Sequence, residues 1–244
     1  MNDQINIALE DFKKFMRLNE FPDFETSYTL TNPDSNFPNI EACAKYAINP
    51  KQHTLILPTN FSVSKSTLFH EFTHIWDYET QVQGDKIRSI GLNGYSEFHA
   101  SQVQLAHLLS FPTIDSISSF SMNQTICPHG ESITVEQHIN DKYDCAVSLF
   151  ENNYFRKNAK CLLTSLGVLF NYWGFRSICE KHATDYQELI NNSVFLDSIP
   201  TILFSSMNRL MHGFLTDEEI TQSIDIYNRI ISHIIEHYRI PVTF

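Results

Sequence analysis

One short segment of the sequence has the residue types and the spacing for metal chemistry, HEFTH at residues 70–74. On a helix, positions i and i+4 project from one face a turn apart. The imidazoles of His70 and His74 can therefore bind one tetrahedral Zn²⁺ at about 2.0–2.1 Å. Glu71 can accept a proton from a water that attacks a carbonyl and then deliver it to the leaving amine. We expect two metal ligands and a general base here.

A catalytic zinc site needs a third protein ligand and one open position. The downstream residues that fit are Glu97 and His99. They are two residues apart on an expected helix, so their side chains point about 200° apart and cannot both face one metal. Glu97 shares its face with small and polar residues such as Ser101, whereas His99 shares its face with Val103 and Ala106. We favour Glu97 as the third ligand and keep His99 as the alternative.

The elements that must position these residues can be read from the surrounding pattern. Ser64 is a suitable N-cap for an amphipathic helix over residues 64–78. Two short apolar runs, 42–48 and 54–58, flank a proline-containing turn and predict a β-hairpin ahead of that helix. After a polar link we expect a second helix over about residues 95–110.

The rest of the chain reads as mostly helical. The predicted elements are helices over about 4–18, 132–158, 159–181, 185–211 with a break at Pro200, and 216–239, a short strand at 28–30, and a loop at 112–130. The fold class is therefore α+β, mostly helical, with a small antiparallel or mixed N-terminal sheet and a helical C-terminal portion. We expect a single unit over residues 1–244, in which 1–111 carry the hairpin and metal-binding helices, and 112–244 shape specificity.

Composition excludes several classes of protein. The 244 residues are 42% hydrophobic and 13% aromatic, which argues against disorder, and five cysteines are too few for a disulfide scaffold. The net charge of −11 argues against a nucleic-acid partner. The longest apolar run, 161–175, is too short for a bilayer span, and no secretory signal is evident, so we expect a cytoplasmic protein with free thiols and no membrane partner. The oligomeric state is not indicated.

The motifs LFHEFTH (68–74) and SEFHA (96–100), with the run TLILP (54–58) ahead of them, resemble the zincin metallopeptidases. The resemblance is to the gluzincin branch, which has a glutamate third ligand, and most of all to the compact intracellular proteases of the ImmA/IrrE type. Thermolysin-like members have an acidic residue four positions after the third ligand, where this chain has Ser101.

The resemblance implies a zinc-dependent metallopeptidase that hydrolyses an intracellular protein or peptide. The implied metal ligands are His70, His74 and Glu97, the implied general base is Glu71, and the strand 54–57 is implied as the edge that aligns an extended substrate. Two other functions stay open: a zincin-fold binding or regulatory module without proteolysis, and a metal-dependent hydrolase of a non-peptide amide.

Several supporting roles are left open by the sequence. Asp77, three residues after His74, either orients an imidazole or faces solvent. An oxyanion donor is also needed, and the possible residues are Tyr95, His129, His138, Tyr143 and Tyr172.

Two further patterns are explained without metal. The inverted motif HIIEH at 233–237 has only seven residues after it, none of them an acid or a histidine, and fits an isoleucine-rich core helix. The run Cys127-Pro128-His129 has no matching second pair and is typical of a loop.

Overall fold

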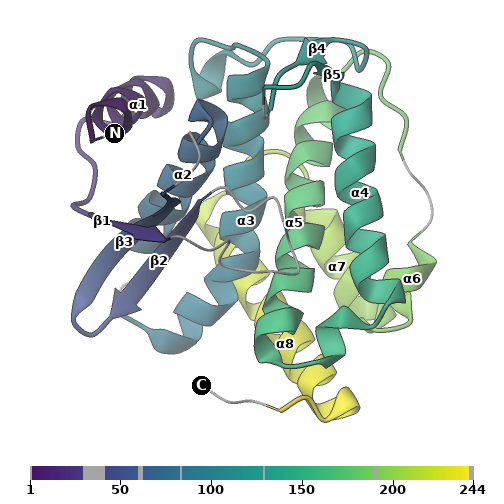
Figure 1. The fold of residues 1–244 in the computed structure, drawn as a ribbon. Coiled ribbons are helices and arrows are strands. Elements are labelled where there is room, and N and C mark those ends of the chain that lie inside the picture. The colour runs from purple at the N-terminus through teal and green to yellow at the C-terminus, as the bar shows by residue number, and fades with distance from the viewer. Residues whose placement is uncertain are drawn as a thin grey trace.

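The computed structural model describes residues 2–29, 42–59, 63–82, 84–128, 130–188 and 192–241. These residues form an α+β fold that is mostly helical, with a small mixed sheet near the N-terminus, as the sequence predicts. Figure 1 shows the arrangement as successive layers. The sheet and α1 (Asn2–Met16) lie on one side of α2 (Lys65–Gln81), and the later helices lie on the other side of α2.

The sheet has three strands, β1 (Glu25–Thr29), β2 (Cys43–Ile48) and β3 (Lys51–Pro58), in the order β1-β3-β2. β2 and β3 pair antiparallel, which confirms the predicted hairpin, while β1 joins β3 in parallel. The central strand β3 alternates between buried and partly buried residues, with Leu55 and Leu57 in the core. The sheet is therefore mixed, with one face packed on the helices.

A first hydrophobic cluster joins α1 (Asn2–Met16), the sheet and α2 (Lys65–Gln81). Phe12 of α1 lies edge-on to Phe69 and Phe72 of α2, at centroid distances of 5.3 and 5.5 Å. These aromatic contacts anchor one face of α2 in the core. As a result, the opposite face of the same helix is turned toward α3 (Lys86–Leu108).

The helix α3 (Lys86–Leu108) begins nine residues earlier than the expected start at residue 95. The expectation of a polar link was wrong for two physical reasons. Asp85 caps the helix by accepting hydrogen bonds from the backbone N–H groups of Ile87 and Arg88, at 2.7 and 3.1 Å. Gly91 also allows close packing, since a Cβ there would lie 2.6 Å from Ile224 of α8 (Asp217–Tyr238). This glycine admits a neighbouring helix and does not end α3.

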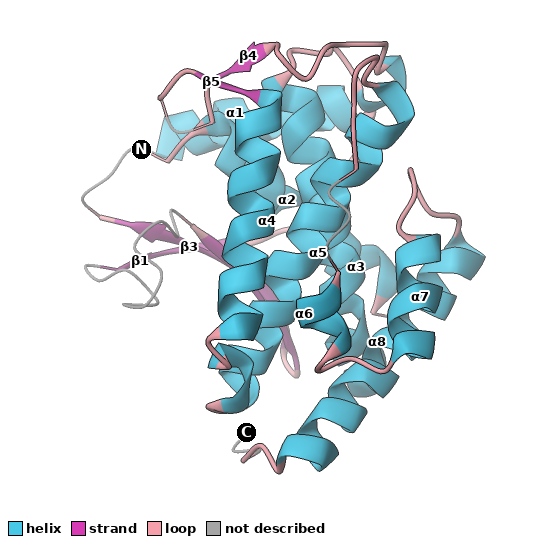
Figure 2. Cartoon of the chain, turned by 90° about the vertical axis from the view of Figure 1, so that its right-hand side faces the viewer, coloured by secondary structure: helices cyan, strands magenta, loops and turns pink. Residues whose placement is uncertain are grey.

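The remaining helices form the larger hydrophobic cluster. They are α4 (Val135–Glu151), α5 (Ala159–His182), the short α6 (Ser193–Leu196), α7 (Thr201–Leu210) and α8 (Asp217–Tyr238). Two-residue strands β4 (Thr125–Ile126) and β5 (Ile133–Thr134) form a small ladder at one end of the bundle (Figure 2). β4 lies within the segment 112–130 that was expected to be a loop, whereas β5 occupies the start of the helix expected over 132–158, which begins at Val135. α7 begins directly after Pro200, which confirms the break predicted there in the helix over 185–211. Before Pro200, the only helix among the described residues of that span is the short α6, and residues 189–191 lie outside the described residues.

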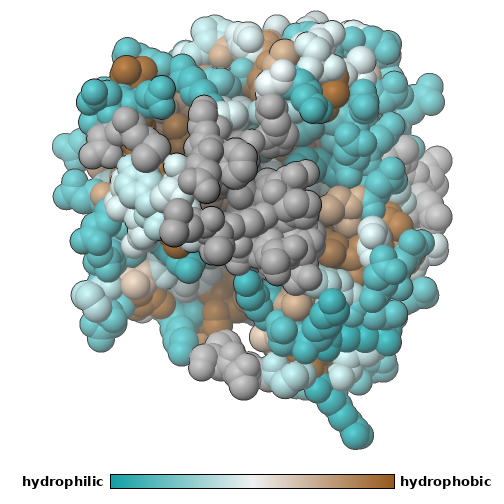
Figure 3. Space-filling model, in the orientation of Figure 1, coloured by the Kyte–Doolittle hydropathy of each residue, from teal (hydrophilic) through white to brown (hydrophobic). Residues whose placement is uncertain are grey.

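The visible surface is largely polar on the face shown in Figure 3, where hydrophobic residues appear in separate patches outside the grey atoms. Among the described residues, none of the helices combines the length and the hydrophobicity that a bilayer span requires.

Candidate metal centre

α2 carries the two histidines of the HEFTH motif on the face that looks toward α3. The helix begins after Ser64, whose Oγ accepts a hydrogen bond from the backbone N–H of Thr67 at 3.1 Å, as the capping pattern predicts. The side chains of His70 and His74 are each 13% exposed. Both rings are therefore held within the protein but still have access to solvent.

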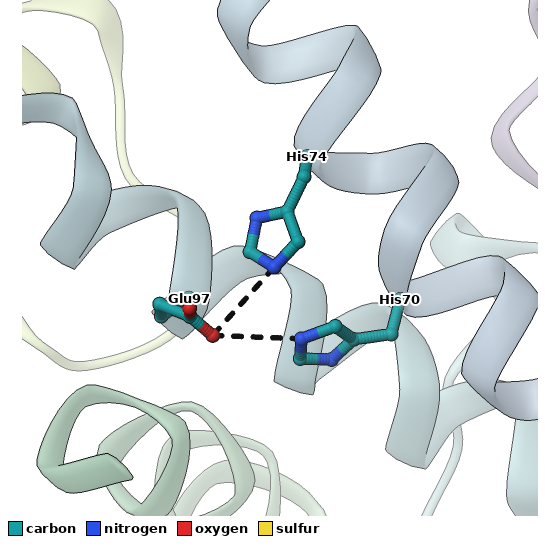
Figure 4. A group of neighbouring side chains, drawn as sticks. All are labelled: His70, His74 and Glu97. Carbon is teal, nitrogen blue, oxygen red and sulfur yellow. Dashed lines mark ion pairs between the residues drawn. The ribbon is translucent and has the colours of Figure 1, made fainter. Parts of the chain in front are cut away.

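Glu97 of α3 completes the cluster that the sequence predicts. Its Oε2 lies 3.5 Å from Nε2 of His70 and 3.6 Å from Nε2 of His74, and Figure 4 shows the three side chains pointing toward one another. Two ligands at about 2.0–2.1 Å from a tetrahedral zinc ion are about 3.3 Å apart, so these separations are close to those of a coordinated set. Within the described ranges, this is the single group of three such ligands whose atoms all lie within 4.8 Å of one another.

The three side chains are electrostatically coupled. Burial would lower the pKa of His74, but the charge of Glu97 and the hydrogen bond to it, together with Glu71 and Asp77, raise the pKa to about 9. Burial would raise the pKa of Glu97, but His74 and His70 hold it well below its usual range. Glu97, with Glu71 and Asp77 nearby, thus stabilises a positive charge on His74, and the same carboxylates favour a cation between the two imidazoles.

The two histidine rings differ in how they are oriented. Nδ1 of His74 lies 2.7 Å from Oγ of Ser96, a fully buried residue on α3. When His74 Nδ1–H donates to this hydroxyl, the lone pair of Nε2 faces Glu97 and His70. Nδ1 of His70 is buried and has no hydrogen-bond partner among the described residues, although its ring packs edge-on to that of His74 at 4.7 Å. The nitrogen and oxygen atoms of the cluster and the distances between them fit zinc. A hydrogen bond orients the ring of His74, and the described residues provide none for Nδ1 of His70.

The side chain of Glu71 points from α2 toward the sheet. The residue is 6% exposed, and its Oε2 accepts a hydrogen bond from the backbone N–H of Ala44 in β2 at 2.5 Å. One carboxylate oxygen of the expected general base is thus fixed by main chain. The same contact places β2 directly beside the HEFTH motif.

The expectation that residues 54–57 form the substrate-aligning edge is wrong. These residues belong to β3, which is paired on both sides, by β1 and by β2. A strand with two neighbours has no main-chain groups left for a peptide. The edge next to α2 is β2, and the sequence alone could not show that β1 would add to the far side of the hairpin.

His99 does not join the cluster. Its Nδ1 lies 2.8 Å from Oδ1 of Asp77, and its ring stacks on that of Tyr95 at 5.5 Å. Asp77 is 2% exposed, so it is not a solvent-facing acid. It does orient an imidazole, but the imidazole is that of His99 and not that of a predicted ligand.

The possible oxyanion donors lie against other residues. Tyr143 and Tyr172 pack on each other at 5.2 Å, and His138 packs on Phe175 at 4.9 Å. Tyr95 lies against His99, as described above, and His129 lies outside the described residues. None of these contacts places a hydroxyl or an imidazole at the His70–His74–Glu97 cluster.

The sequence interpretation missed Tyr78, whose hydroxyl donates to Oδ1 of Asn93 at 3.4 Å. Burial is the main cause that raises the pKa of the Tyr78 hydroxyl, and Tyr227 and Glu97 add to the rise. The phenol is therefore influenced by the charge of Glu97. The sequence does contain a signal for this proximity, because Tyr78 follows His70 by eight residues and shares its helical face. Asn93 in turn donates to the hydroxyl of Tyr227 at 3.3 Å.

The other patterns stay apart from this centre. His233, Glu236 and His237 are exposed on α8 and do not belong to a group of three metal-ligand side chains within the described ranges. Cys127 is exposed, with its Sγ 3.4 Å from Oγ of Ser132. All five cysteines are free, as expected, but only Cys161 and Cys179 are buried.

The chemistry of the centre is carried by its own residues: two imidazoles and a carboxylate at coordination distance, with a second carboxylate fixed beside them. Comparison of the chain with protein-family models, with curated proteins and with solved structures found no match.

Proposed function

We propose that this chain is a zinc-dependent metallopeptidase that hydrolyses peptide bonds of a protein or peptide. The observation that carries the proposal is the meeting of His70, His74 and Glu97, whose ligand atoms lie within 4.8 Å of one another. Two imidazoles and one carboxylate are a ligand set used by catalytic zinc, which keeps a fourth position open. Glu71 next to this set is the residue type that peptide hydrolysis needs as a proton carrier.

A zinc ion held by these three residues would supply Lewis acidity for the substrate carbonyl and lower the pKa of the attacking water. The chain supplies the proton transfers. The Ala44 N–H holds Oε2 of Glu71 at 2.5 Å, so Oε1 is the oxygen that we expect to accept the proton from the attacking water. The same oxygen then returns that proton to the leaving nitrogen as the C–N bond breaks.

The edge strand β2 is the element that we expect to align the substrate. The Ala44 N–H points to Glu71, so it lies on the side of β2 that faces away from β3. In an antiparallel pair, residues two apart expose their main-chain groups on the same side, which puts those of Tyr46 on that outer edge as well. An extended peptide can pair there by β-strand addition, with its scissile bond brought next to Glu71.

The decisive variant is Glu71→Gln, because glutamine keeps an oxygen that can accept from Ala44 N–H but cannot carry a proton. The control is Glu79→Gln on the same helix, where Glu79 pairs with the exposed Lys51 and the buried His53. Both variants and the wild type are supplied with one equivalent of zinc and digested against a proteome-derived peptide library, read by mass spectrometry.

We expect cleavage by the wild type and by Glu79→Gln, and a loss of at least about 10²-fold in Glu71→Gln with zinc still bound. Cleavage that is equal in all three proteins would refute the assigned role of Glu71. A zinc-binding wild type that leaves the whole library intact would refute the peptidase proposal. A parallel panel of small non-peptide amides then shows whether the centre hydrolyses another amide.

A further inference from the structure

Arg176 of α5 is a fully buried cation on the far side of the bundle from the metal centre. Its side chain is 1% exposed. Gly167 on the same helix faces Glu97, and Arg176 follows it by nine residues, which is about half a turn away in direction and about 13 Å along the axis. The surroundings of Arg176 are therefore separate from those of the metal ligands.

Only one of the three nitrogens of this guanidinium has polar partners among the described residues. Nη1 donates to Oδ1 of Asn208 in α7 at 2.6 Å and lies 3.5 Å from Oε1 of Glu188. Nε and Nη2 are buried and have no hydrogen-bond partner among the residues that the structure describes. These two nitrogens form one edge of the guanidinium plane, with parallel N–H bonds that match two oxygens of a carboxylate or a phosphate.

Tyr172 precedes Arg176 by four residues on α5 and therefore lies on the same face of the helix. Burial raises the pKa of the Tyr172 hydroxyl to about 12, while the charge of Arg176 and a hydrogen bond with Tyr186 oppose the rise. The hydroxyl of Tyr186 is buried as well. The two N–H groups of the guanidinium edge thus lack an acceptor among the described residues, next to the phenols of Tyr172 and Tyr186.

We propose that Arg176 and Tyr186 bind a small oxyanion, a carboxylate or a phosphate, in which two oxygens accept from Nε and Nη2 of the arginine. Buried polar groups are nearly always hydrogen-bonded, and a buried charge needs compensation. Glu188 compensates only in part, because it approaches Nη1 alone at 3.5 Å and its side chain is 45% exposed. An oxyanion satisfies both the charge and the geometry of the free edge.

The test measures binding of inorganic phosphate, acetate and chloride to the full chain by calorimetry at constant ionic strength. We expect saturable binding of phosphate or acetate with one site per chain, and no binding of chloride. The comparison of phosphate with acetate identifies which oxyanion the site prefers. Absence of saturable binding of both oxyanions at up to about 100-fold excess would overturn the proposal and leave water as the partner of the edge.

Four variants locate the site. Arg176→Lys keeps the charge and removes the paired edge, so it should weaken binding by at least about tenfold. Tyr186→Phe should weaken it several-fold, whereas Glu188→Gln should strengthen it by removing a competing negative charge. Arg209→Lys, at an exposed position of α7, is the matched control and should bind like the wild type.

Binding that is unchanged in Arg176→Lys contradicts the assignment. If that variant does not fold, as judged by circular dichroism, the opposite effects of Tyr186→Phe and Glu188→Gln decide the question. Equal binding by those two variants and the wild type then overturns the proposal.

Discussion

The hydrogen bond between Ser96 and His74 should set how tightly the chain holds zinc. Ser96→Ala removes the oxygen that lies 2.7 Å from Nδ1 of His74, at a position that is fully buried. The Nδ1–H of a zinc-bound His74 then has no acceptor, and an unsatisfied buried donor costs about 1–3 kcal/mol. Since about 1.4 kcal/mol is a tenfold change, zinc affinity should fall by about 5- to 150-fold. This range includes the loss usually seen when a hydrogen-bond partner of a ligand is removed.

The assay is a competition for zinc between the protein and a chromophoric chelator at fixed pH. Ser101→Ala is the matched control, because Ser101 is also fully buried on α3 but hydrogen-bonds Asn171 and not a metal ligand. Ser101→Ala should change zinc affinity by less than about threefold. Equal affinities for the two variants, both shown to be folded by circular dichroism, would refute the reasoning that Ser96 orients the ring.

Further predictions concern packing and pH. Gly94→Ala should destabilise the protein by about 1–3 kcal/mol in urea unfolding, because the new methyl would collide with the ring of Tyr227. Gly167→Ala should be close to neutral, since its methyl would only touch Glu97 at 3.5 Å; an equal loss in both would contradict this account of packing. Burial, with a contribution from Lys65, lowers the pKa of His107 from 6.5 to about 4, so the unfolded chain binds a proton that the folded protein does not. Stability should therefore fall as pH drops from about 6.5 to about 4, by about 1–2 kcal/mol for this partly exposed ring. His107→Gln should flatten this slope in denaturant unfolding, and an unchanged slope would exclude His107 as its source.

The cluster of His70, His74 and Glu97 was predictable because helix geometry relates sequence spacing to direction. Residues four apart on one helix face the same way, so His70 and His74 had to be neighbours. The opposite directions of Glu97 and His99 made them exclusive alternatives, and the structure brings Glu97 to the cluster and pairs His99 with Asp77. The N-cap of α2 was predictable for the same reason, because Ser64 hydrogen-bonds the first turn that follows it.

The features that the sequence did not predict depend on contacts between distant segments. The early start of α3 depends on Gly91 and Gly94, which resemble loop residues until Ile224 and Tyr227 of α8 are placed against them. The position of β3 within the sheet depends on β1, which joins it in parallel from an earlier part of the chain. The contact of Ala44 with Glu71 spans 27 residues and has no pattern in the sequence.

The most direct test of the proposed function measures the metal content of the purified chain by mass spectrometry, together with a crystal structure grown in the presence of zinc. We expect about one zinc ion per chain, bound by His70 and His74 and within about 2.0–2.2 Å of a Glu97 oxygen. His70→Ala should hold less than a tenth of that content. A wild-type chain that holds no stoichiometric transition metal, or a metal bound through His99 in place of Glu97, would contradict the proposed function.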